Sequence, residues 1–93
     1  MEMKTTFYSD FTIADYYGAY AIEDTYNRAM KAWKNDYEYL TELVMVLNWK
    51  IFEWYEKNKD VANLYNTLWE KADEYARENL KGKELEYFYK TTD

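Results

Sequence analysis

The sequence predicts an all-α fold, a small antiparallel three-helix bundle with short extra helices at the N- and C-termini. Two observations predict this class. Apolar residues recur at steps of three and four along most of the chain, which is the period of an amphipathic helix. The chain also contains no proline and only two glycines, Gly18 and Gly82, so few residues interrupt a helix. A length of 93 residues, with 48% of them hydrophobic, predicts one domain over residues 1–93 with a single modest core.

The N-terminal part is expected to contribute two helices. Residues 10–17 are predicted as a short helix that begins after a cap at Ser9 or Asp10. Gly18 should end this helix or bend a continuous one, because glycine is common where helices terminate. Residues 19–34 are predicted as the next helix. The expected buried faces consist of Phe11, Ala14 and Tyr17 on the first helix, and of Ala19, Ile22, Tyr26, Ala29 and Trp33 on the second.

The rest of the chain predicts two long helices and a short terminal element. The run Asn35-Asp36-Tyr37-Glu38 has the pattern of a helix start, and the helix it opens should continue to about Lys57. The run Asn58-Lys59-Asp60 predicts a turn and a new cap, followed by a helix over residues 61–79. Residues 83–90 form either a last short helix or a tail across the bundle. The predicted main stripes are Leu40, Val44, Leu47, Ile51 and Trp54 on the first helix, and Val61, Leu64, Leu68, Ala72 and Tyr75 on the second.

The helix expected at 36–57 carries a second apolar stripe on the side opposite its main one. Met45, Trp49 and Phe52 follow the spacing i, i+4, i+7, so they share one side of the helix. A helix that is apolar on two sides is either buried within its own fold or carries a partner on one side. The stripe is therefore covered by Phe7, Phe11 or the Tyr87-Phe88-Tyr89 tail, or it binds another protein. The glutamates expected to flank it are Glu38, Glu42, Glu53 and Glu56.

The residue types that are missing exclude much catalytic chemistry. The chain has no histidine and no cysteine, which removes the usual zinc ligands, the Ser-His-Asp triad and thiol nucleophiles. No catalytic residue, cofactor site or metal site is predicted, and the protein is not expected to be an enzyme. The chain has 12 tyrosines, 4 tryptophans and 4 phenylalanines, and such residues are enriched at protein interfaces. Packing on the main stripes does not explain every tyrosine. The remaining ones form either a half-buried boundary layer or a binding surface. They are Tyr8, Tyr16, Tyr20, Tyr37, Tyr39, Tyr87 and Tyr89.

The net charge of −6 limits the class of partner. Binding to nucleic-acid phosphates or to an anionic membrane surface needs clustered Lys and Arg, so neither is expected. A protein partner with a basic surface is compatible with the charge. No apolar run approaches the ~20 residues that span a bilayer, and residues 1–8 lack the pattern of a signal peptide. A cytoplasmic location is expected.

Three runs of sequence resemble a group of bacterial mobile-element proteins. They are FTIADYYGAYAIEDTYNRAMKAWK, YLTELVMVLNWKIFEWYEKN and LYNTLWEKADEYARENLKGKELEYFY, which cover most of the chain. In overall composition and residue pattern they are similar to the small acidic helical accessory proteins of Firmicutes phages and conjugative elements, which are mostly uncharacterised. The resemblance implies an accessory protein acting inside a bacterial cell, a class that includes inhibitors of host defence such as anti-CRISPR proteins.

Two functions follow as expectations. The first is a non-enzymatic acidic protein-binding module that inhibits or regulates a host nucleic-acid enzyme through the stripe at Met45, Trp49 and Phe52. The second is a structural homo-oligomer, in which a self-complementary stripe is buried between two copies as a homodimer.

Overall fold

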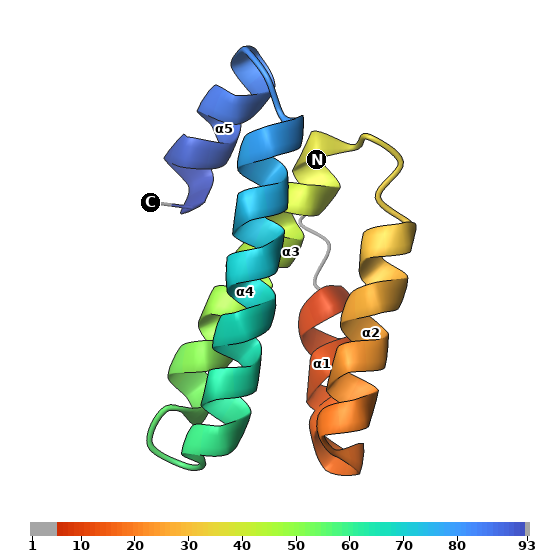
Figure 1. Ribbon diagram of the computed structural model, residues 1–93, viewed down its shortest axis with the longest axis vertical. Helices are drawn as coiled ribbons and strands as arrows, with labels where there is room; N and C mark the ends of the chain where they lie inside the picture. The colour runs from red at the N-terminus through yellow and green to blue at the C-terminus, as the bar shows by residue number, and fades with distance from the viewer. Residues whose placement is uncertain (1–5, 93) are drawn as a thin grey trace.

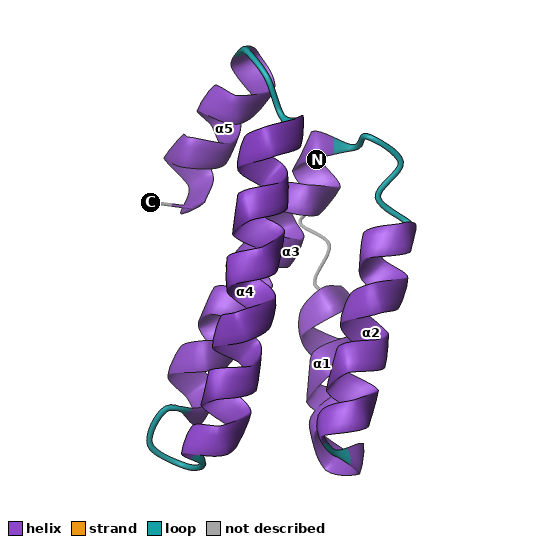
Figure 2. Cartoon of the chain, viewed as in Figure 1, coloured by secondary structure: helices purple, strands orange, loops and turns teal. Residues whose placement is uncertain are grey.

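The computed structural model describes residues 6–92, and that part of the chain consists of helices joined by short loops (Figures 1 and 2). The all-α class is therefore confirmed, and of the two alternatives predicted for residues 83–90 the structure shows the helix. The five helices are α1 (Thr6–Tyr17), α2 (Ala19–Lys31), α3 (Tyr37–Trp54), α4 (Lys59–Asn79) and α5 (Lys83–Thr92).

The two long helices begin at side-chain caps. The Asp36 carboxylate accepts hydrogen bonds from the backbone N–H groups of Glu38 and Tyr39, at 3.1 and 3.2 Å. The Asn58 side chain caps α4 in the same way, accepting from the N–H groups of Asp60 and Val61 at 3.0 and 3.3 Å. Each cap satisfies backbone donors that have no partner within the helix. The helix starts predicted at both runs are confirmed.

The first two helices form a hairpin with a sharp corner at Gly18. The φ of Gly18 is +108°, a conformation that side chains with a Cβ rarely adopt, so glycine permits the chain to reverse here. α1 begins near Thr6, several residues before the predicted start, which makes it almost as long as α2. α2 ends sooner than predicted, because Lys34 and Asn35 have left-handed backbone conformations that no helix continues through.

The α1–α2 hairpin lies beside the α3–α4 hairpin, and α5 folds back onto one end of the second (Figure 1). α3 and α4 form the main packing pair. α1 packs against α2 and α3, α2 packs against α4, and α5 packs mainly on α3. The N-terminal half of α3 is therefore enclosed on several sides, and the core lies around it. The fully buried apolar side chains include Phe11, Leu40, Leu43, Leu47, Tyr65, Ala72, Ala76 and Phe88.

Two residues predicted on buried faces are exposed instead. Ala19 and Tyr17 both lie at the hairpin corner, and Tyr17 is 79% exposed. The buried face of α1 is set by Phe7, Phe11 and Ala14, and at about 100° per residue Tyr17 falls roughly a quarter turn away from that line. The prediction placed Tyr17 on the buried face because it considered only the steps from Phe11 and Ala14.

Candidate partner-binding surface

The second stripe of α3 changes from covered to exposed along its length. Met45 is half-buried, Trp49 is 46% exposed and Phe52 is 72% exposed. The three side chains share one side of the helix because they are spaced by four and three residues. Burial decreases steadily towards the C-terminal end of α3, so the same stripe has a packed end and a free end.

The C-terminal helix covers the packed end. Phe88 of α5 is fully buried, and α5 packs on α3. Thr91 and Thr92, at the end of α5, line a small hollow of about 240 Å³ together with Met45 and Trp49. α5 thus covers the stripe beside Met45, and Phe52 is not among the residues that line this hollow. Phe7 and Phe11, the other candidates for covering it, pack in the core against the rings of Tyr39 and Tyr65.

The exposed end of the stripe is continued by a residue that sequence reasoning missed. Tyr55 follows Phe52 by three residues, so the two side chains are neighbours on the helix surface, and it is 59% exposed. At about 100° per residue it lies roughly a quarter turn from the line of Met45, Trp49 and Phe52, and it widens the exposed surface to that side. Its spacing from Phe52 was readable in the sequence. We call the surface formed by Trp49, Phe52 and Tyr55 the α3 face. Three exposed aromatic rings within two helical turns are unusual on a small domain, where large apolar side chains are normally covered.

The glutamates do not form the rim that the sequence predicts. Glu42 is buried, at 7% exposure, because it lies on the N-terminal half of α3, which other helices enclose. Glu53 is half-buried and binds side chains of the same molecule, as described below. Glu38 is also half-buried, which leaves Glu56 as the exposed acid beside the α3 face. The acidic rim is therefore smaller than expected, and Glu56 is its exposed member.

A buried polar network lies on another side of α3 and is centred on Lys50. The Lys50 side chain is completely buried. Its Nζ lies 2.6 Å from Asp15 Oδ2 and 3.0 Å from Glu53 Oε2, and it donates to Thr12 Oγ1 at 3.3 Å. Burying an ammonium group costs several kcal/mol unless it is paired and hydrogen-bonded, and these partners supply both.

Asp15 and Glu53 accept hydrogen bonds from further donors, and the pKa values of Tyr65 and Glu53 are shifted. Asp15 accepts hydrogen bonds from Tyr65 Oη at 2.5 Å and from Trp54 Nε1 at 3.0 Å, and Glu53 accepts one from Tyr8. Burial, together with the bond to Asp15, raises the pKa of Tyr65 well above its ordinary value. Partial burial raises the pKa of Glu53, but the hydrogen bonds from Tyr8 and Lys50 and the Lys50 charge outweigh it, so this pKa is lowered.

The network links elements rather than forming an open site. An amine between two carboxylates could transfer protons in an accessible pocket, but the Lys50 side chain has no exposure through which a substrate could reach it. Its contacts join α1, which supplies Thr12 and Asp15, to α3. The sequence carried a signal for this, because Lys50 continues the steps of three and four from Leu43 and Leu47 along the buried side of α3.

Within residues 6–92, no group of three or more acidic side chains is arranged to hold a metal ion. None of the helices in that range is long and apolar enough to cross a membrane.

Comparison with known proteins leaves the family open. No protein-family model, no curated protein and no solved structure matches the chain at a significant level. The resemblance to accessory proteins of mobile elements therefore stays a prediction, and function has to be argued from the surface itself.

Proposed function

We propose that the protein is a non-enzymatic binding module whose α3 face docks onto a basic surface of a partner protein. The observation that carries this proposal is the 72% exposure of Phe52 beside Trp49, on a helix whose other half is enclosed. A few buried aromatic residues dominate the energy of most protein interfaces. Covering these rings removes apolar surface from water, at about 25 cal/mol for each Å².

Charge favours a basic partner over a second copy at this face. The chain carries a net charge of −6, and Glu56 lies exposed next to the aromatic rings. Pairing this face with itself would bring like charges together, which opposes association. A partner surface rich in Lys and Arg gains from the same charges. Enzymes that hold nucleic-acid phosphates have such surfaces, because phosphate contacts are made by clustered basic side chains.

The biological role that fits this partner class is inhibition or regulation. A module that covers a phosphate-binding surface would compete with nucleic acid for it. Together with the resemblance to mobile-element accessory proteins, this supports an inhibitor of a host nucleic-acid enzyme, similar in role to anti-CRISPR proteins.

Affinity capture with matched variants tests the proposal. Wild-type protein, Phe52→Ser and Tyr16→Ser are immobilised and exposed to a bacterial lysate, and captured proteins are identified by mass spectrometry. Tyr16 is the matched control, because it is an exposed aromatic residue on a different helix. The expected result is a partner retained by wild type and Tyr16→Ser and lost with Phe52→Ser.

Calorimetry on the purified partner then gives the magnitude. A central aromatic contact removed from an interface costs about 2 kcal/mol or more, which corresponds to roughly thirtyfold weaker binding. Glu56→Lys should weaken binding more at low salt than at high salt, because salt screens the interaction between exposed charges. A partner that binds Phe52→Ser as tightly as wild type would show that the α3 face is not the docking surface.

A further inference from the structure

A second exposed apolar surface surrounds the corner of the α1–α2 hairpin. Tyr16 is 92% exposed, Tyr20 is 82% exposed and Ile13 is 59% exposed, in addition to the exposed Tyr17. We call these four residues the hairpin face. They come from the end of α1 and the start of α2, on either side of Gly18. This face is made of residues from α1 and α2 and shares none with the α3 face, and it holds the most exposed aromatic side chains among the described residues.

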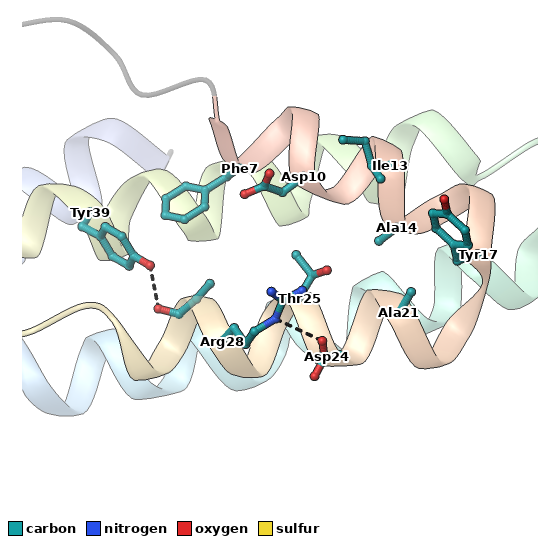
Figure 3. Close-up of a pocket in the computed structure, with 11 residues that line it drawn as sticks. Phe7, Asp10, Ile13, Ala14, Tyr17, Ala21, Asp24, Thr25, Arg28 and Tyr39 are labelled. Atoms are coloured by element: carbon teal, nitrogen blue, oxygen red, sulfur yellow. Dashed lines mark hydrogen bonds and ion pairs between the residues drawn. The ribbon is translucent and has the colours of Figure 1, made fainter.

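A groove of about 450 Å³ runs between α1 and α2 and continues this surface. Figure 3 shows its two walls facing each other, with α3 and α4 behind them, so the groove opens away from the rest of the molecule. Ile13 and Tyr17 line it from α1 and Ala21 from α2. The small alanine side chains at Ala14 and Ala21 leave room between the helices.

The exposed area is close to what one side of a stable interface needs. Aromatic side chains bury about 150–250 Å² each, so three tyrosines at these exposures present on the order of 500 Å². A standard interface buries about 800 Å² per partner. The groove walls on α1 and α2 supply further contact area. A patch of this size is at the upper end of what monomeric proteins leave exposed.

The charges in the groove are of both signs and are arranged to complement a second copy. Asp10 on α1 makes no hydrogen bond or ion pair within residues 6–92, and Arg28 on α2 lines the same groove. Arg28 Nε lies 3.0 Å from Asp24 Oδ2, but a guanidinium has five N–H donors and can bind a second carboxylate. The groove therefore offers Asp10, together with Arg28 and its ion-paired Asp24, to the same occupant.

Asp10 and Arg28 also lie at similar heights above the hairpin corner. Asp10 precedes Gly18 by eight residues and Arg28 follows it by ten, which places them roughly 12 and 15 Å along the two antiparallel helices. A two-fold axis parallel to these helices would set α1 of one copy against α2 of the other, with both corners at the same end. Asp10 then faces Arg28 of the second copy, twice in each dimer.

We infer that the hairpin face and its groove pair with a second copy of this chain, in a two-fold symmetric dimer closed by reciprocal Asp10–Arg28 ion pairs. The four helices of the two hairpins form one layered interface, and Tyr17 and Tyr20 of both copies pack at the corner end. This inference does not depend on the proposed function, because it uses a different surface.

Light scattering and sedimentation measurements on charge-exchanged variants test the inference. Wild-type protein should have twice the mass of the 11.5 kDa chain at high concentration. Asp10→Arg alone and Arg28→Glu alone should each weaken self-association by on the order of a hundredfold, because each homodimer then pairs like charges at both positions. An equimolar mixture of the two variants should recover a dimer, because the mixed dimer contains two opposite-charge pairs.

A second set of variants separates this surface from the α3 face. Tyr17→Glu combined with Tyr20→Glu should be monomeric, with the helical circular dichroism of wild type, whereas Phe52→Ser should remain a dimer. A wild-type protein that stays monomeric at millimolar concentration overturns the inference. So does a dimer that Phe52→Ser disrupts, or one that neither charge variant weakens.

Discussion

Lys50 and Asp15 form a buried ion pair that joins the two helical hairpins, with Nζ and Oδ2 2.6 Å apart. Asp15 comes from α1 and Lys50 from α3, so the pair bridges elements far apart in the sequence. Asp15 is also the acceptor for the Tyr65 hydroxyl and for the Trp54 indole N–H. One carboxylate therefore ties α1 to both helices of the second hairpin.

Removing the lysine should be costly. Breaking a buried ion pair by deleting one member typically costs about 3–5 kcal/mol, because the other charge stays buried without its partner. We expect Lys50→Met to lower the free energy of unfolding by about that amount, since methionine fills most of the volume and leaves the charge of Asp15 uncompensated. Urea unfolding monitored by tryptophan fluorescence measures the change.

Lys57→Met is the matched control for this prediction. Lys57 is exposed and close to the end of the same helix, where its Nζ lies 5.6 Å from the Trp54 ring centroid. Exposed substitutions usually stay within about 0.5 kcal/mol. If both variants lose the same stability, the Lys50 network is not what holds the hairpins together.

Alkaline pH should weaken the fold through Tyr65. Its pKa in the folded protein is raised above the ordinary value of 10.0 by burial and by the hydrogen bond to Asp15. The unfolded chain therefore loses the Tyr65 proton first as the pH rises. The stability that this hydroxyl contributes is fully present below pH 10 and is lost progressively above it, because only the unfolded state can release the proton there.

Tyr65→Phe isolates this contribution. The variant is less stable at neutral pH, since Asp15 loses a donor, but its stability should fall less steeply above pH 10. The difference in slope should approach about 1.4 kcal/mol per pH unit, the value for one proton. Denaturant unfolding between neutral and alkaline pH measures both slopes, with Tyr16→Phe as the exposed control. Equal slopes in wild type and Tyr65→Phe would contradict the assignment.

Local signals in the sequence predicted most of the helices, because caps and stripes act over a few residues. Asp36 and Asn58 each satisfy backbone N–H groups two and three positions later, so their role is readable without knowing the fold. α5 was predicted only as one of two alternatives, since its burial depends on where α3 lies. The sequence predicted that the second stripe of α3 is either covered or exposed, but not which of its residues are exposed. That depends on where α5 packs on α3, which is set by tertiary contacts.

The burial of charged groups was not predictable from periodicity alone. Lys50 and Glu42 both occupy enclosed positions on α3, although their residue types favour solvent. Lys50 is buried together with Asp15, which α1 brings to it by packing against α3. A pattern within one helix carries no information on which carboxylate another helix brings close to it.

Phe88, which helps to cover the packed end of the second stripe of α3, and Phe52, at its exposed end, provide the sharpest check of the α3 face. Phe88 of α5 is completely buried, whereas Phe52 is largely exposed. Phe88→Ala should lower the free energy of unfolding by about 3–5 kcal/mol, the usual cost of emptying a core aromatic site. Phe52→Ala should change it by no more than about 0.5 kcal/mol, because an exposed ring loses little packing. Chemical denaturation of the two variants measures both values. If Phe52→Ala proved as destabilising as Phe88→Ala, the Phe52 ring would be packed within the free protein, and it could not serve as an open surface for a partner.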